Sequence, residues 1–235
     1  MVSPERAITT MRFALATFFF LFLILYSPAF AGAWLREKGT GFTSSTASAS
    51  LSRDLGQTTY LEHAVRDDVT LGAELSFHTA ASGLQSGFAS FFVRRPLVKQ
   101  RWPHVWAYEL GMGVRWTGNL VLPNLKAGIS WGRGYSLNEI DGWMAIDTSV
   151  LWDLYNSEYL AKIDGTLGMN FTPRLTGMLQ LFYSGWTRAD ATYFAPSIVF
   201  RPVKARPHVR LQVGAETLIG EPTSVTLKFS LWRNF

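Results

Sequence analysis

The sequence has no cysteine and few charged residues, and each shortage excludes a class of protein. Without cysteine, the 235-residue chain can form no disulfide, thiolate metal site, cysteine nucleophile or lipoprotein anchor. Small secreted domains usually depend on disulfides. Charged residues make up 17% of the chain, against about 25% in soluble domains. The net charge of +5 is spread along the chain without a run of Lys or Arg, so nucleic acid is not an expected partner.

Long apolar runs are missing from residues 32–235. A membrane-spanning helix needs about 20 predominantly apolar residues. No uninterrupted stretch of that length occurs there, which excludes a helical inner-membrane protein. The region is therefore expected to be periplasmic, secreted or part of an outer-membrane barrel.

The first 31 residues differ from the rest. Arg12 precedes an apolar stretch over residues 14–26, and Ala29-Phe30-Ala31 follows it. This order predicts a signal peptide over residues 1–31, cleaved between Ala31 and Gly32, with Met11 as an alternative start. The other interpretation is a membrane anchor, for which the apolar stretch is too short.

Alternation of apolar and polar residues is what the sequence has in abundance. In segment 159–171, Ile163 and Leu167 share the apolar face, whereas Lys162 and Asp164 lie on the other face. A period of two indicates a β-strand; in a helix these charges would not separate from the apolar residues. The same pattern recurs in segments 69–78, 104–116, 120–132, 208–218 and 224–235.

Other segments have strand composition with a weaker pattern. Segments 142–153, 175–186 and 191–201 alternate loosely, and segments 58–65 and 87–95 are ambiguous in phase. The weakest is the Ser-, Thr- and Ala-rich segment over residues 40–52. We predict it as the first strand because a closed barrel needs a partner for the last strand.

Aromatic residues are plentiful, at 14% of the chain with nine Trp. Transmembrane barrels place such residues in girdles around a lipid-facing band. Together with the alternation, this predicts one all-β domain over residues 32–235: a transmembrane antiparallel up-and-down β-barrel of about 12 strands, in a range of about 10–14. The alternative is a soluble periplasmic β protein that binds an apolar ligand, which requires the apolar stripes to point inward.

Turn residues separate the segments and suggest a meander. Short turns are predicted at Arg66–Asp68, Thr172–Arg174 and Arg201–His208. With both termini in the periplasm, these turns lie on the periplasmic side, together with Leu97–Pro103 and Tyr135–Asp141. The loops on the opposite side are expected to be short, which disfavours a receptor or an adhesin.

The last segment, 224–235, ends on the aromatic residue Phe235. It resembles the closing strand of Gram-negative outer-membrane β-barrels, where a terminal Phe is read by the barrel assembly machinery. The whole chain resembles small proteobacterial outer-membrane barrel proteins, and stretches 32–41 and 61–72 resemble parts of uncharacterised exported proteins. The resemblance implies an outer-membrane location and Phe235 as an assembly signal. The partners it implies are outer-membrane lipids, lipopolysaccharide and the assembly machinery.

Charged residues on the polar strand faces are predicted to line the lumen. They are Glu74, Glu109, Arg115, Lys126, Asp147, Asp153, Lys162, Asp164, Arg210, Glu216 and Lys228. Both signs are present, whereas a strongly selective pore would more often show a ladder of one sign. Buried charges are costly unless paired. We therefore expect a narrow passive channel or a structural component of the envelope.

The sequence contains no pattern that indicates an active site. Its histidines, His63, His78, His104 and His208, are widely spaced, so no metal and no cofactor is expected. His78 and Ser76 share one strand face. An alternative function, a barrel enzyme acting on lipid or lipopolysaccharide, would depend on this pair, because a base must lie next to the nucleophile that it activates. We expect no catalysis.

Overall fold

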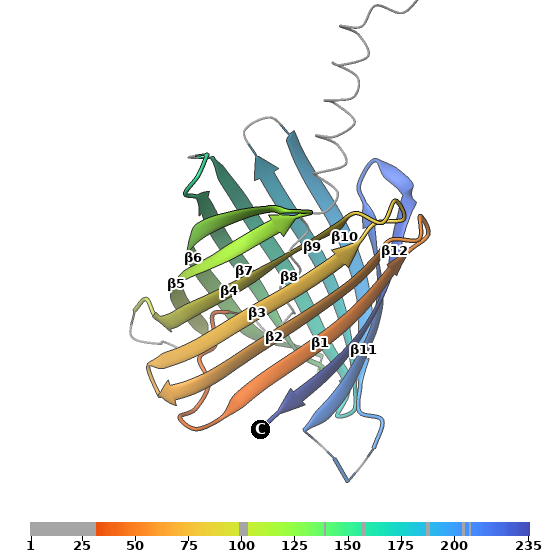
Figure 1. Cartoon of the computed structure of the whole chain (residues 1–235). Coiled ribbons are helices and arrows are strands. Elements are labelled where there is room, and N and C mark those ends of the chain that lie inside the picture. The colour runs from red at the N-terminus through yellow and green to blue at the C-terminus, as the bar shows by residue number, and fades with distance from the viewer. Residues whose placement is uncertain are drawn as a thin grey trace, which may run out of the picture.

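The structure, a computed structural model, describes residues 32–98, 103–138, 140–156, 158–186, 189–203, 205–206 and 208–235. The predicted signal peptide, residues 1–31, lies outside the described residues. The strands are β1 (Gly41–Ser50), β2 (Leu55–Arg66), β3 (Val69–Thr79), β4 (Gln85–Pro96), β5 (His104–Thr117), β6 (Leu120–Leu137), β7 (Ile140–Asp153), β8 (Tyr159–Thr172), β9 (Leu175–Trp186), β10 (Ala189–Phe200), β11 (Val209–Leu218) and β12 (Glu221–Asn234). They form one closed barrel (Figure 1).

Each strand pairs antiparallel with its neighbours in sequence, and β1 closes the ring on β12. The closing ladder runs from Phe42 opposite Asn234 to Ser50 opposite Thr226. Beyond it, the Gly41 amide donates to the Phe235 carbonyl at 2.7 Å, and the Phe235 amide donates to the Gly41 carbonyl at 3.0 Å. Closure removes the sheet edges that would otherwise expose unpaired backbone groups. The predicted up-and-down barrel of twelve strands is confirmed.

The strands match the predicted segments closely, including segment 40–52, which forms β1. The main difference is at β6, which continues to Leu137 instead of ending near residue 132. The turn predicted over Tyr135–Asp141 is therefore too long. Tyr135 pairs with Gly142, and its hydroxyl donates to the Gly168 carbonyl at 3.1 Å. The missing side chain at Gly142 leaves room for the Tyr135 ring, so the strands stay paired there.

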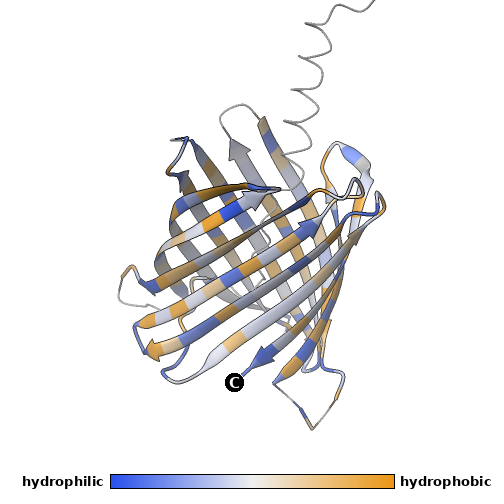
Figure 2. Cartoon of the chain, in the orientation of Figure 1, coloured by the Kyte–Doolittle hydropathy of each residue, from blue (hydrophilic) through white to orange (hydrophobic). Residues whose placement is uncertain are grey.

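Apolar side chains cover the outer wall of the barrel. Leu110, Ile163 and Phe229 are 57%, 48% and 56% exposed. Figure 2 shows hydrophobic residues alternating with other residues along the strands of this wall. The alternative of a soluble barrel with inward apolar stripes is therefore wrong. Continuous exposed apolar surface of this kind requires apolar surroundings, such as lipid.

No helix among the described residues is long and apolar enough to cross a membrane.

Candidate functional site

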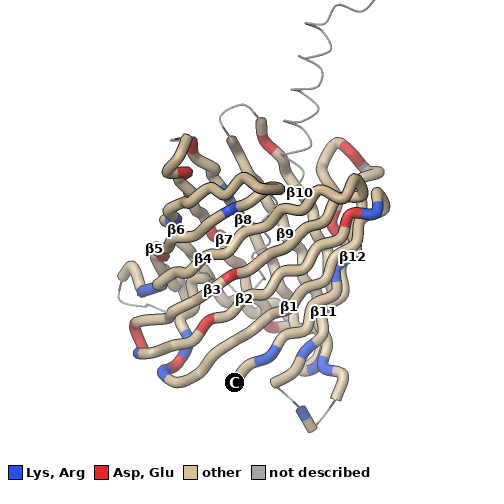
Figure 3. Tube along the Cα trace, in the orientation of Figure 1, with Lys and Arg blue, Asp and Glu red and all other residues tan. Residues whose placement is uncertain are grey.

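The charged residues predicted for the lumen lie on the inward faces of their strands. Glu74 is on β3, Glu109 and Arg115 on β5, Lys126 on β6, Asp147 and Asp153 on β7, Lys162 and Asp164 on β8, Arg210 and Glu216 on β11, and Lys228 on β12. Those with almost no exposed surface are Glu74, Glu109, Asp153, Lys162, Asp164 and Glu216. Acidic and basic residues are interspersed along the barrel (Figure 3).

Three charged residues near these were not predicted from the sequence. They are Arg36, Glu62 and Arg94, of which the last two are buried. Arg36 precedes the first strand, and Glu62 and Arg94 lie in the two segments of ambiguous phase. In β4 the ambiguity arises because aromatic residues occupy both faces, with Phe91 exposed and Phe92 buried. Ser86 and Ser90 are small polar residues that are buried on the same face of β4 as Arg94. Their spacing in the sequence could have shown which face of β4 points inward.

Arg94 is the centre of a chain of alternating charges. Its Nη1 atom donates to Glu62 Oε2 at 2.8 Å, and its Nη2 atom donates to Glu109 Oε2 at 2.7 Å. Lys126 Nζ contacts the other Glu109 oxygen at 2.6 Å, and Arg36 pairs with Glu62. We call Arg36, Glu62, Arg94, Glu109 and Lys126 the Arg94 network. It connects β2, β4, β5 and β6 with the segment that precedes β1.

Two further ion pairs lie elsewhere in the lumen. Lys228 Nζ lies 2.5 Å from Glu216 Oε2, and this ion pair joins β11 and β12. Arg115 Nη2 donates a hydrogen bond to Asp153 Oδ2 at 3.1 Å, and this ion pair joins β5 and β7. The Arg115 guanidinium also lies 4.9 Å from the centroid of the Trp186 ring. Pairing of this kind compensates buried charges and reduces the field that would favour ions of one sign.

Aromatic and aliphatic side chains fill the lumen near the end of the barrel at which Phe235 lies. The buried members are Phe42, Tyr60, Phe92, Met178, Val199 and Trp232, with Trp143 packed against them. They come from strands on different sides of the ring. The Phe42 and Trp232 ring centroids are 6.1 Å apart, and those of Tyr60 and Phe92 are 5.8 Å apart. We call this group the aromatic cluster; it narrows the lumen at that end.

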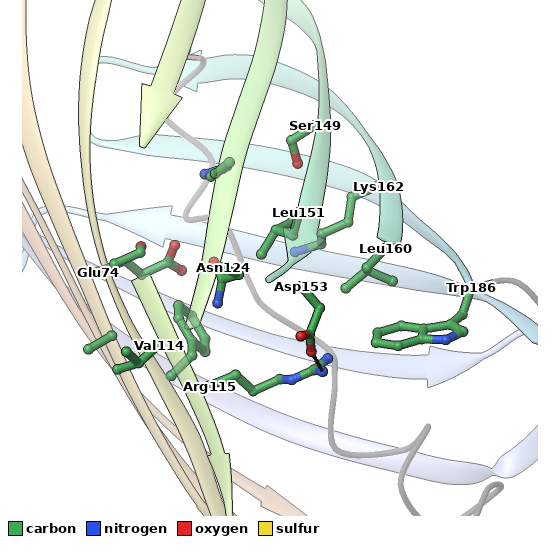
Figure 4. Close-up of a pocket in the computed structure, with 14 residues that line it drawn as sticks. Glu74, Val114, Arg115, Asn124, Ser149, Leu151, Asp153, Leu160, Lys162 and Trp186 are labelled. Atoms are coloured by element: carbon green, nitrogen blue, oxygen red, sulfur yellow. Dashed lines mark hydrogen bonds and ion pairs between the residues drawn. The ribbon is translucent and has the colours of Figure 1, made fainter. Parts of the chain in front are cut away.

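A cavity of about 40 Å³ lies in the lumen toward the opposite end (Figure 4). Its charged and aromatic lining includes Glu74, Arg115, Lys126, Asp153, Lys162 and Trp186. This space is large enough to hold water, and polar side chains that could bind water line it.

The His78 and Ser76 side chains are in contact. His78 Nε2 lies 2.8 Å from Ser76 Oγ, and Ser76 Oγ lies 2.9 Å from Thr58 Oγ1. The Ser76 side chain is completely buried. Among the described residues, no group of three or more His, Cys, Asp or Glu is arranged to hold a metal ion.

Solved structures with a similar fold are outer-membrane proteins. KdgM porin aligns with a TM-score of 0.59 at 10% identity, covering 83% of this chain and 99% of that chain. NanC porin aligns at 0.54 and 10% identity, covering 81% and 97%. An outer membrane channel from Pseudomonas putida F1 aligns at 0.53 and 12% identity, covering 90% and 100%. The chain therefore has the fold of Gram-negative outer-membrane β-barrels.

No protein-family model matches the chain, and the search of curated proteins gives no match.

Proposed function

We propose that this chain is an integral bacterial outer-membrane protein that encloses a narrow passive channel for water and small ions. The observation that carries the proposal is the lumen lining. Acids and bases are paired between strands of the barrel, around a small cavity in the lumen. The apolar outer wall supports the membrane location, and the similar folds of porins and channels agree with it.

The pairing of lumen charges supports weak ion selectivity. One similar solved structure is described as KdgM porin in complex with disordered oligogalacturonate. A path for an acidic oligomer needs cations that are available to it. In this lumen, Arg94, Lys126 and Lys228 each already contact a carboxylate. We therefore propose small ions and water, and not acidic sugars, as the permeant species.

Planar-bilayer recordings of the purified, refolded protein test this function. We expect small current steps with little preference for cations or anions, because the lumen is narrow and its charges are balanced. Heat-denatured protein at the same concentration is the control. Large and strongly selective steps would contradict the proposal, since wide porins need about 16–18 strands. Absence of any current would favour a purely structural role in the envelope.

Processing and assembly are part of the same proposal. The chain is exported by its signal peptide, and the mature protein starts at Gly32 after cleavage behind Ala31. The carboxy-terminal strand with Phe235 is recognised by the barrel assembly machinery, and lipopolysaccharide surrounds the outer rim. The resemblance to exported proteobacterial barrels supports these steps. Amino-terminal sequencing of protein from outer membranes tests the first of them, because retention of residues 11–31 would exclude it.

The second candidate function is a lipid-modifying enzyme, and the 2.8 Å contact between Ser76 and His78 is the observation in its favour. A serine nucleophile must reach its substrate, and this one is completely buried and faces Thr58. Lipid lies on the other side of the barrel wall. We therefore propose no catalysis. If the purified protein hydrolyses phospholipid and the His78→Ala variant does not, the enzyme function would replace the channel as the first candidate.

A further inference from the structure

The segment before β1 lies within the barrel. We call residues 32–40 the amino-terminal strap. Ala33 is completely buried, and the Trp34 ring packs against the inward-facing Gly132 of β6, where no side chain would fit beside it. Figure 1 shows the first described residues inside the ring of strands. The strap therefore occupies space through which a solute would otherwise pass.

Arg36 fixes the strap near the carboxy-terminal end of the barrel. It pairs with Glu62 of β2, and its Nη1 atom donates to Asn234 Oδ1 of β12 at 3.2 Å. Its guanidinium also lies 4.7 Å from the centroid of the Phe42 ring. These contacts attach the strap both to the Arg94 network and to the aromatic cluster.

Gly32, the first described residue, lies among polar groups of three strands. A Cβ at this position would be 2.6 Å from Ser130 Oγ, 2.7 Å from Asp147 Oδ1 and 3.3 Å from Arg94 Nη2. Only glycine tolerates an approach this close. Ser130 donates a hydrogen bond to Asp147. The residue at which we expect the mature chain to start is therefore in contact range of a carboxylate inside the lumen.

This wall of the lumen has a further acid. Asp164 of β8 lies directly opposite Asp147 of β7 in the strand register. Its Oδ1 atom is buried and has no hydrogen-bond partner among the described residues. Lys126, Lys162 and Lys228 interact electrostatically with Asp164. Arg94 and Lys126 interact in the same way with Asp147. Two neighbouring inward carboxylates still favour one more cation close to them.

We propose that Asp147 is the binding site for the α-ammonium group of Gly32, which keeps the strap in the lumen as an internal plug. Signal-peptide cleavage creates this group, so the inference rests on the proposed function and on the proposed cleavage behind Ala31. An ammonium group donates three hydrogen bonds, and its bonds to a carboxylate are charge-assisted and short. Held at Gly32 and at Arg36, the strap narrows the path between the cavity and the carboxy-terminal end.

Chemical accessibility of the amino terminus tests the site directly. The folded mature protein is treated with an amine-acylating reagent near neutral pH, where an α-amine reacts before lysine because its pKa is about 7.7–8.0. Mass spectrometry of the amino-terminal peptide then measures the extent of modification. We expect acylation at least tenfold slower than in the denatured protein. Equal rates in folded and denatured protein, or a mature chain that does not begin at Gly32, would overturn the proposal.

Two isosteric variants on one strand separate binding from general folding. Asp147→Asn removes the proposed carboxylate and should speed acylation of the folded protein severalfold. Asp153→Asn changes another inward acid of β7, which contacts Arg115 toward the other end, and should leave the rate unchanged. Heat-modifiable gel mobility confirms that each variant is folded. An equal effect of both variants, or no effect of Asp147→Asn, would contradict a specific site.

Conductance tests the plug independently of the amine. Trp34→Ala, and deletion of residues 33–38, should each raise the single-channel conductance severalfold in planar bilayers. If the amine is protected and no variant conducts, the binding site stands and the channel function fails. If the wild type conducts and its amine reacts freely, the channel stands and the plug fails. Wild-type conductance unchanged by both alterations would also overturn the plug.

Discussion

At the scale of single residues, two adjacent arginines on β4 are placed very differently. Arg94 is buried and lies between Glu62 and Glu109, whereas Arg95 is 47% exposed and pairs with Asp68 at the rim. The strand period of two sends one side chain into the lumen and the next to the surface. The sequence alone did not settle which arginine faces inward.

Substitution of each arginine by alanine should reveal this difference. Arg94→Ala leaves two buried carboxylates with one cation fewer, and breaking a buried pair costs about 3–5 kcal/mol. Arg95→Ala removes an exposed pair, which solvent screens, so the loss of stability should be much smaller. Urea unfolding in lipid vesicles measures both free energies. Equal losses of stability would mean that the Arg94 network does not hold the lumen together.

A neighbouring pair on β8 tests which face meets lipid. Leu167 is on the exposed face of β8, and Thr166 faces Gln180 of β9 in the lumen. An arginine at a lipid-facing site near the bilayer midplane costs about 2–4 kcal/mol, and a lumen site costs less. Leu167→Arg should therefore reduce the folded fraction in vesicles, measured by heat-modifiable mobility, far more than Thr166→Arg. Similar yields for the two variants would contradict the assigned faces.

At the scale of elements, β12 is the strand that closes the barrel, because it pairs with β1. Phe235 follows it and exchanges two backbone hydrogen bonds with Gly41, and its ring stacks on His63 with a centroid distance of 6.3 Å. Deletion of Phe235 removes these contacts between the two ends of the sheet. We expect the deletion to slow the appearance of heat-modifiable protein in outer membranes and, to a smaller degree, in vesicles without assembly machinery.

Phe235→Ala separates the ring from the backbone, since it keeps both hydrogen bonds. If the assembly machinery recognises the aromatic ring, as we propose, this variant should slow assembly in cells and have little effect on folding into pure lipid. Wild-type amounts of both variants in the outer membrane would show that the terminal residue is not an assembly signal.

Strand positions could be predicted because alternation is a local property of the chain. Residues 159–172 illustrate this, since both charged residues of β8 lie on its inward face, where Leu160 is the one large aliphatic residue. The phase of β4 and the length of β6 could not be predicted in the same way. They depend on which side chains find space across the sheet, as the Tyr135 ring does beside Gly142.

At the scale of the whole molecule, the content of the lumen depends on closure. Sequence patterns placed Glu109 and Lys126 on polar strand faces, and pairing of β5 with β6 brings them to 2.6 Å. The partners of Arg94 were beyond the reach of such patterns. The Arg36–Glu62 pair joins a segment without regular structure to a strand, so strand alternation could not predict it.

The ion preference of the proposed channel would depend on all the lumen charges together, so changes to single pairs should shift it. Arg115 and Asp153 are paired at 3.1 Å beside the cavity, where an ion would pass close to both. Asp153→Asn leaves the cation of this pair and should shift permeation toward anions, whereas Arg115→Gln should shift it toward cations. A shift of about threefold in the permeability ratio corresponds to about 0.65 kcal/mol. Reversal potentials in a salt gradient measure both directions, and the double variant should return to wild-type values. Shifts of the same sign in both single variants would show that this pair does not line the conducting path.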